Sequence, residues 1–275
     1  MTDIHSEEDV ATEAAGAKAG FNPMFGEWRQ RFDFPPVPHR GTGGPARAAF
    51  QAAIRAAMTN QFVYWGEVQV VITLYLDVQS VLETSETADV DNYAKGILDA
   101  IKGPEGVLID DTQVQALTVS WIDHHKTWFE VEIRASPDDF MIKPVRFFEM
   151  PDGLYYPQPA ALWDKAGPKL ATALDHFAGL TISEMMAARK KQLRHALRQK
   201  GVTRFKAAQM SAPMETQLRG FHRSRLFDAG YDLVGLAEWR AQRTAWAAAN
   251  AEHAGFLDEM AKTHGALVKG LGAAR

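Results

Sequence analysis

The chain contains no cysteine among its 275 residues. Disulfide bonds are therefore excluded, and so are zinc or iron–sulfur sites with cysteine ligands, which leaves oxygen and imidazole groups as the only strong metal ligands. The chain also lacks a strong excess of either charge, because acidic and basic residues nearly balance at a formal net charge of −4. A protein that coats DNA through a globally basic surface is not expected, whereas a local basic surface remains compatible with this charge.

Long apolar runs are missing as well. No stretch of about 18 apolar residues occurs, so no membrane span is expected. Residues 1–24 are polar, rich in alanine and glycine, and acidic near their start, without the apolar segment of a secretory signal. We interpret them as a disordered acidic tail of a cytoplasmic protein. The sequence also has no Gly-rich phosphate loop and no recognisable Ser/His/Asp arrangement.

Residues 25–135 combine helix and strand patterns. Pro45 suits a first helical position, and the alanine-rich stretch that follows it repeats apolar residues at helical spacing. Residues 67–78, 114–121 and 128–133 alternate apolar and polar side chains, which is typical of strands. The last two of these strands are close in sequence, so we expect them to form a hairpin.

The second half of the chain has a different composition. Residues 136–163 are rich in proline and aromatic residues, and we interpret them as a connector. Residues 164–275 are predicted to form an all-helical extension. The expected fold class is α/β (α+β), with a small mixed-sheet domain over 25–135 followed by these two parts. The extension could widen a DNA footprint, mediate oligomerisation or dock a protein partner such as a replication or phage protein.

Two acidic pairs flank one predicted helix. Asp89 and Asp91 stand just before it, and Asp110 and Asp111 stand after it, at the start of the next strand. Side chains two residues apart in extended backbone share a face, and a strand–helix–strand arrangement can bring Asp111 beside them. Converging carboxylates repel each other unless a cation lies between them, and oxygen ligands favour Mg²⁺ or Mn²⁺. Lys95, one helical turn after Asp91, could neutralise a phosphate oxygen.

Each of these residues also has a structural interpretation. Asp91 or Asn92 is a favoured helix N-cap, because its side-chain oxygen accepts an amide hydrogen bond. An Asp-Asp pair is common in solvated turns, and Lys95 alone would be a surface lysine or the ion-pair partner of Asp91. The combination of all of them, in order around one helix, favours a shared site.

The same segment resembles the signature of the RusA family of Holliday-junction resolvases. That signature has a D-x-D-N-x-x-K helix, a D-A-[LI] continuation and a D-D-x-Q-[VI] strand start. The matching residues are Asp89 to Asn92 with Lys95, then Asp99-Ala100, then Asp110 to Val114. The resemblance covers about residues 66–135. It implies a small mixed α/β homodimer with Mg²⁺-dependent endonuclease activity on branched DNA in recombination and repair, with Mn²⁺ as a substitute ion.

The resemblance also assigns roles. The metal-binding carboxylates would be Asp89, Asp91 and Asp111, with Asp110 as the other half of the acidic pair, and the catalytic residues would be Asp89, Asp91, Lys95 and Asp111. The chain departs from the family pattern in two places. Residues 85–88 lack the basic residue and proline that often precede the motif, and about 140 further residues follow the domain.

A strongly basic helix is predicted from Ser183 to Lys200. A solvated helix face and a surface that contacts the DNA backbone explain it equally well. The candidate DNA contacts are Lys126, Arg189, Lys190, Arg194 and Arg198. His124 and His125, next to Lys126, are interpreted as turn residues rather than metal ligands.

Three functional hypotheses follow. The sequence favours a Mg²⁺-dependent, structure-selective endodeoxyribonuclease that cuts Holliday junctions or related branched DNA. The alternative is a non-catalytic DNA-binding or assembly module with the same fold, which would bind junctions without cleavage. A third hypothesis is another phosphoryl- or glycosyl-transfer enzyme, because an Asp-x-Asp motif also binds metal–diphosphate substrates, although nothing in the sequence indicates a nucleotide-sugar pocket.

Overall fold

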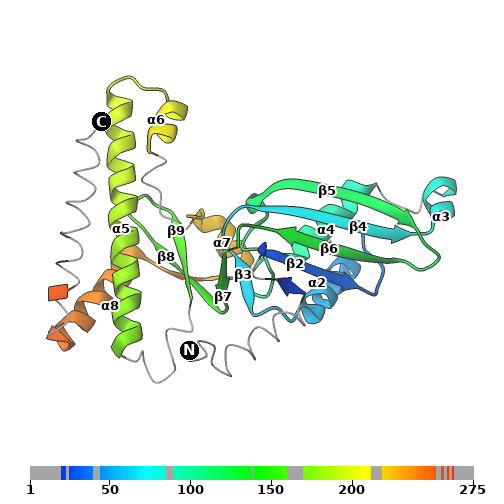
Figure 1. Cartoon of the computed structure of the whole chain (residues 1–275), viewed down its shortest axis with the longest axis horizontal. Coiled ribbons are helices and arrows are strands. Elements are labelled where there is room, and N and C mark those ends of the chain that lie inside the picture. The colour runs from blue at the N-terminus through cyan, green and yellow to red at the C-terminus, as the bar shows by residue number, and fades with distance from the viewer. Residues whose placement is uncertain are drawn as a thin grey trace, which may run out of the picture. The chain divides into compact units, whose positions relative to one another are not determined.

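The structure, a computed structural model, describes residues 20–22, 25–39, 44–84, 89–137, 139–159, 170–211, 219–251, 255–256, 259 and 262. The chain divides into two compact units, Met1–Pro144 and Val145–Arg275 (Figure 1). The boundary between the units, after Pro144, therefore lies nine residues beyond the expected end of the mixed-sheet domain at residue 135. The expected tail over residues 1–24 lies largely outside the described residues.

A five-stranded sheet with the order β1-β2-β6-β4-β5 forms the centre of the N-terminal unit. Its strands are β1 (Phe21–Asn22), β2 (Glu27–Phe32), β4 (Val68–Leu76), β5 (Val114–Asp123) and β6 (Trp128–Arg134). β4 pairs in parallel with β5 and antiparallel with β6. The predicted β5–β6 hairpin is therefore wrong, because β4 lies between the two strands. Alternation of side chains identifies strands but does not specify which strands are neighbours.

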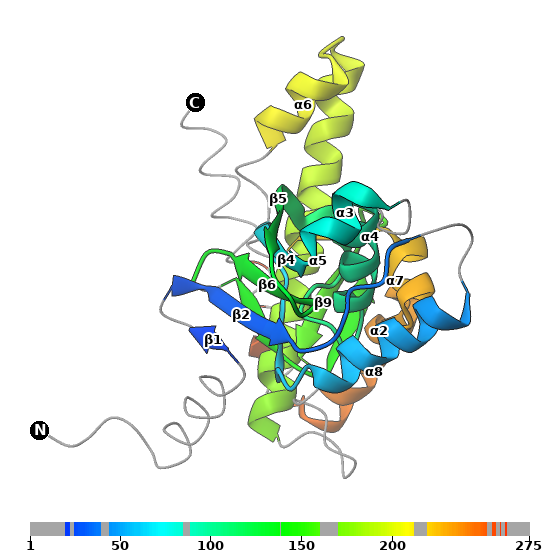
Figure 2. The same cartoon turned by 90° about the vertical axis from the view of Figure 1, so that its right-hand side faces the viewer.

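Helices cover one face of this sheet. They are α2 (Pro45–Ala57) and α4 (Val90–Ile101), whereas the short helix α3 (Val78–Glu83) follows the end of β4 and has no buried residue. A further pair of strands is β3 (Phe62–Tyr64) with β7 (Phe140–Ile142). Figures 1 and 2 show α2 and α4 side by side against the sheet. The core lies between them, with Ile54 of α2, Ile97 of α4 and Ile72 of β4 all fully buried. Burial of this apolar face fixes the orientation of α4, whose opposite face is left to the solvent.

The C-terminal unit contains a three-stranded sheet with the order β10-β8-β9. Its elements are β8 (Val145–Glu149), β9 (Tyr155–Pro159), α5 (Leu170–Gln199), α6 (Arg204–Ser211), α7 (Arg223–Ala229), β10 (Asp232–Val234) and α8 (Leu236–Ala249). The mixed α and β class is confirmed. The connector expected over 136–163 instead contains β7, β8 and β9, and the extension is not all helical because it includes β10. Proline is tolerated in β9 because β9 is an edge strand.

The packing of the C-terminal unit centres on Trp239 of α8, which is fully buried. Its Nε1 donates a hydrogen bond to the carbonyl oxygen of Glu149 at 2.8 Å, so the indole joins α8 to β8. Nearby, Glu184 of α5 accepts hydrogen bonds from Arg240 and Arg243 of α8. In the part of the chain that the structure describes, no helix has the length and apolarity that a bilayer crossing requires.

Candidate functional site

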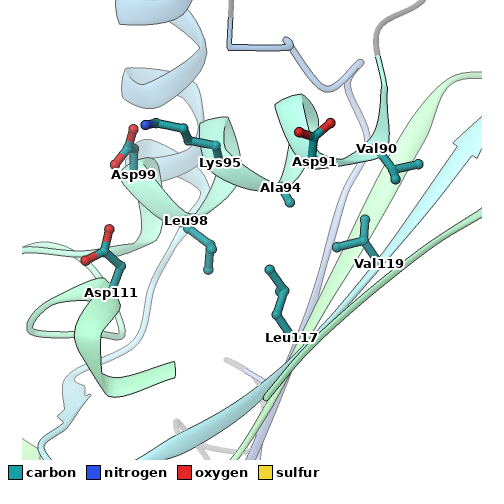
Figure 3. Close-up of a pocket in the computed structure, with 9 residues that line it drawn as sticks. All are labelled: Val90, Asp91, Ala94, Lys95, Leu98, Asp99, Asp111, Leu117 and Val119. Atoms are coloured by element: carbon teal, nitrogen blue, oxygen red, sulfur yellow. The ribbon is translucent and has the colours of Figure 1, made fainter. Parts of the chain in front are cut away.

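A pocket of about 310 Å³ opens between α4 and β5 in the N-terminal unit. Its charged lining residues are Asp91, Lys95, Asp99 and Asp111, and its apolar lining comes from α4 and β5. In Figure 3, Asp91, Lys95 and Asp99 project from successive turns of α4, and Asp111 faces the helix from the other side. The pocket thus gathers three of the four residues that the sequence predicts to be catalytic, and Asp89 is not among its lining residues.

The spacing of α4 explains this arrangement. Asp91, Lys95 and Asp99 are four residues apart, so they occupy one side of the helix while Ile97 and Ile101 fill the core side. α4 begins at Val90, with Asp89 as the N-cap residue in extended conformation and without a side-chain cap hydrogen bond. The N-cap residue is therefore Asp89, and not Asp91 or Asn92 as the sequence predicts. Because the helix rises about 1.5 Å per residue, Asp91 and Asp99 lie about 12 Å apart along its axis.

Asp111 is positioned by the buried Gln113. The 3₁₀ turn η2 (Asp111–Gln113) connects to β5, and Gln113 is completely buried beneath it. The Gln113 Nε2 donates to the carbonyl oxygens of Tyr64 and Gly66 at 2.9 and 2.8 Å. Its Oε1 accepts from the backbone N–H of Ile109 and Asp110 at 2.7 and 3.0 Å. One amide with all of these bonds holds the turn against β3, and so fixes the point from which Asp111 projects.

Asp110 turns away from the pocket. Only 5% of it is exposed, and its carboxylate accepts a hydrogen bond from the Thr112 hydroxyl at 2.7 Å. It also forms a capping box with Gln113, in which each side chain bonds the other residue's backbone N–H. This geometry gives Asp110 a structural role in shaping the turn.

An ion-pair chain connects Asp111 to α2. Lys102 Nζ lies 3.3 Å from Asp111 Oδ2 and 2.9 Å from Asp99 Oδ1. Arg47 Nη2 lies 2.6 Å from Asp99 Oδ2. Burial alone would lower the pKa of Lys102, but the hydrogen bond and charge of Asp99, together with Asp111, outweigh burial and raise that pKa. Both oxygens of Asp99 are thus engaged by cations, and Lys102 balances part of the charge of Asp111.

The predicted metal site consists of carboxylate groups. Asp89 and Asp91 are exposed, and the Asp111 side chain is 39% exposed, so these carboxylates face solvent rather than the core. Among the residues that the structure describes, no three His, Asp or Glu side chains are gathered closely enough to hold a metal ion. The donors that line the pocket are carboxylate oxygens, the ligand type that hard cations such as Mg²⁺ prefer.

The comparison with protein families decides what this arrangement belongs to. Residues 42–134 match the family described as endodeoxyribonuclease RusA. This segment belongs to the RusA family. The match confirms the resemblance inferred from the motif and extends it toward the N-terminus to include α2. No curated protein matches the chain.

The pocket region contains charged residues that the sequence pattern does not single out. Asp99 belongs to the sequence motif, whereas Arg47 and Lys102 lie outside it, although Lys102 joins Asp99 to Asp111. The spacing of Asp99, eight residues after Asp91 on the same helix, was a usable signal. Nothing local could reveal Arg47, because it lies 52 residues before Asp99 in the sequence.

The predicted DNA contacts have different surroundings. Lys126 is exposed in the turn between β5 and β6, where its backbone N–H bonds His124. In the C-terminal unit, Lys190 is only 8% exposed, and Arg194 Nε donates to the Ser211 hydroxyl at 2.7 Å. Arg198 Nη1 donates to the Val202 carbonyl at 3.1 Å. Lys190 and Arg194 thus contribute to packing, whereas Lys126 and Arg198 present charge to solvent.

Proposed function

We propose that the protein is a Mg²⁺-dependent endodeoxyribonuclease that cuts Holliday junctions or related branched DNA in recombination and repair. The observation that carries the proposal is the pocket of the RusA-family domain, where Asp91, Lys95 and Asp111 come together. The family is one of endodeoxyribonucleases, which supports nuclease activity for this domain. Metal dependence and junction selectivity are our extension of that family assignment.

In this proposal Asp89, Asp91 and Asp111 would be the metal ligands, with Mn²⁺ as a substitute for Mg²⁺, and they would have to approach each other when the ion binds, because they are not gathered closely enough in this structure. Asp110 is left out, because its carboxylate is buried in the capping box. The bound ion would supply Lewis-acid stabilisation of negative charge on the scissile phosphate. Lys95 is exposed on the pocket side of α4, so its ammonium can contact a phosphate oxygen and stabilise the charge that develops there. Lys102 keeps Asp111 oriented through the contact already described.

DNA binding is proposed to involve Lys126 of the pocket domain and, on α5, the partly buried Arg189 and the exposed Arg198. Such contacts with phosphates would hold the substrate without reading its sequence. Lys190 and Arg194 are better explained by packing within the C-terminal unit.

A homodimer is proposed because β5 offers an unpaired, apolar edge in the described sheet. Leu117, Trp121 and Ile122 of this strand are 43%, 39% and 46% exposed. A long apolar edge strand is a template for pairing with a second copy. We expect the wild type to be a dimer by light scattering and Ile122→Lys to be monomeric. Ile142→Lys on β7, also 46% exposed, is the matched control and should remain dimeric. A monomeric wild type would contradict this part of the proposal.

Cleavage is tested with a panel of four-way junction, fork, flap and linear duplex, each with and without Mg²⁺. The wild type should cut the branched substrates only when the ion is present. Asp91→Asn should abolish cutting, whereas Asp33→Asn should not, since the Asp33 side chain is 73% exposed and pairs with Arg31 away from the pocket residues. A folded Asp91→Asn variant that cuts at the normal rate would refute the proposal. Junction binding without cleavage by the wild type would favour the non-catalytic module instead.

A further inference from the structure

A helical hairpin in the C-terminal unit carries an exposed aromatic residue among cations. It consists of the second half of α5 and the antiparallel α6, which lies beside the end of α5 in both views (Figures 1 and 2). Residues 185–211 contain no Asp or Glu. Their basic residues are Arg189, Lys190, Lys191, Arg194, Arg198, Lys200, Arg204 and Lys206. Such an unbalanced segment is complementary to a polyanion.

The hairpin is a folded support. The Arg194–Ser211 hydrogen bond joins α5 to α6, and Ala207 and Ser211 of α6 are buried at 1% and 0% exposure. Thr203 directly precedes α6, and its hydroxyl accepts a hydrogen bond from the Lys206 backbone N–H at 3.3 Å. The side of α6 that faces α5 is thus fixed by packing, so its other side is presented in a defined orientation.

Phe205 is on that other side. It is two residues before Ala207, which places it about 160° around the helix from the buried contact, and it is 72% exposed. Arg204 and Lys206, its sequence neighbours, are both exposed. A single exposed aromatic ring on a protein surface is common and needs no functional explanation. A ring between two cations, on a segment without acidic residues, has the composition of sites that bind unpaired nucleic-acid strands, where a base stacks on the ring and phosphates contact the cations.

We propose that the tip of this hairpin, residues 198–206, binds single-stranded DNA. Phe205 stacks on one unpaired base, and Arg204 and Lys206 contact the flanking phosphates. Single strands are favoured over duplex because the bases of a duplex are stacked on each other and offer no open face to a side chain. Nucleic acid is favoured over an anionic membrane because the exposed apolar residues of α6, Phe205 and Met210, lie about 140° apart around the helix and form no continuous apolar stripe.

The experiment measures the affinity of the full chain for a fluorescent oligo(dT) in EDTA, where the proposed metal-dependent cleavage cannot occur. Phe205→Ala should weaken binding about tenfold, the effect of losing one stacked base, and Phe205→Trp should restore it. Phe227→Ala is the matched control, because Phe227 of α7 is also well exposed at 64% but has Asp228 next to it. Its affinity should equal that of the wild type.

A second variant tests the cations. Removing both with Arg204→Gln and Lys206→Gln should flatten the slope of log affinity against log salt by about 1.4, at about 0.7 for each phosphate contact with a single strand. Circular dichroism should show the same helix content and melting as the wild type, since neither side chain packs in the hairpin.

Three results would overturn the proposal. The first is that Phe205→Ala binds oligo(dT) as tightly as the wild type does. The second is that Phe205→Ala weakens binding to a linear duplex as much as binding to oligo(dT). The third is that Phe205→Ala loses binding to anionic phospholipid vesicles but keeps binding to oligo(dT). The tip is judged separately from the nuclease assignment. If the protein binds single strands through Phe205 but cuts no DNA, the single-strand proposal stands and the nuclease proposal fails. If the protein cuts junctions but Phe205→Ala leaves its affinity for single strands unchanged, the single-strand proposal fails.

Discussion

In the N-terminal unit, Asp111 and Asp99 share Lys102 beside an open pocket, whereas in the C-terminal unit Glu184 is enclosed by Arg240 and Arg243. The Asp111 side chain is 39% exposed and that of Glu184 only 13%. Both are carboxylates paired with cations. The difference is that one can still be reached by a ligand and the other serves only to join α5 to α8. Accessibility of a paired charge, rather than the pairing itself, therefore separates a candidate site from a structural contact.

The comparison is sharpened most by neutralising each carboxylate in turn. We expect Asp111→Asn to lower junction cleavage about 1,000-fold, because it removes a proposed metal ligand, with little change in unfolding free energy. Glu184→Gln should do the opposite, costing about 1–2 kcal/mol of stability because two arginines lose their partner, with cleavage unchanged. Cleavage rates and urea unfolding of both variants provide the check. Equal losses of activity in the two would show that the proposed division between site and scaffold does not hold.

The next largest effect concerns the support beneath Asp111. We expect Gln113→Leu to lower the unfolding free energy by about 3 kcal/mol, because it leaves buried backbone groups of Tyr64, Gly66 and Ile109 without their partner. Gln61→Leu is the control. Gln61 is exposed, and its side-chain amide donates a long hydrogen bond of 3.4 Å to the Thr59 carbonyl, so the loss of this amide should cost less than about 0.5 kcal/mol. Similar unfolding midpoints for the two variants would contradict the role assigned to Gln113.

The same contrast explains what the sequence could reveal. Helical spacing placed Asp91 and Lys95 on one side of α4, and strand alternation located β4, β5 and β6. Both signals depend on residues close together in the sequence, so a single sequence is enough to detect them. The order β6-β4-β5 and the Arg47–Asp99 pair depend on contacts between distant segments, and no local period encodes them.

Composition misled in the second half of the chain for a physical reason. Pro157 and Pro159 suggested a connector, but they lie in β9, an edge strand where a missing N–H leaves no neighbour unpaired. β10 has only three residues, too few for alternation to be recognised, and it forms by pairing with β8. Whether Asp89, Asp91 and Asp111 share an ion stays a prediction.

Acid should destabilise the C-terminal unit. Burial, with a smaller contribution from the charge of Arg146, lowers the pKa of His176 in α5 from 6.5 to about 4. The unfolded chain therefore binds the proton more readily, so the contribution is fully present above pH 6.5 and is lost as pH falls toward 4. Between pH 7 and 4.5 we expect the C-terminal unit to lose about 2–3 kcal/mol from this group.

Hydrogen exchange of α5 amides, followed by mass spectrometry at both pH values, measures that loss. His176→Phe should reduce the acid sensitivity, since a ring of similar shape can pack against Phe148 and Phe177 without titrating. His195→Phe, at an exposed position of the same helix, should leave it unchanged. Acid sensitivity that survives His176→Phe would assign the effect to other groups.

The smallest effect tests how Lys102 acts on the pocket. A cation 3.3 Å from Asp111 both orients that carboxylate and repels an incoming metal ion. The tether is long and partly exposed, worth about 0.5 kcal/mol. The repulsion of a divalent ion a few ångströms away is larger, on the order of 1–2 kcal/mol after screening. Repulsion should therefore dominate binding, while orientation should affect the rate.

We thus expect Lys102→Met to bind Mn²⁺ about tenfold more tightly by calorimetry, yet to cleave more slowly at saturating Mg²⁺. Lys102→Arg, which keeps the charge and can reach both carboxylates, should resemble the wild type. Lys143→Met is the matched control in the same unit, because among the described residues Lys143 Nζ bonds the backbone carbonyls of Asn60 and Glu105 and no carboxylate of the pocket. If Lys102→Met instead bound Mn²⁺ more weakly, orientation of Asp111 would outweigh repulsion. The charge in the pocket would then resemble that around Glu184, a contact that serves chiefly to hold a carboxylate in place.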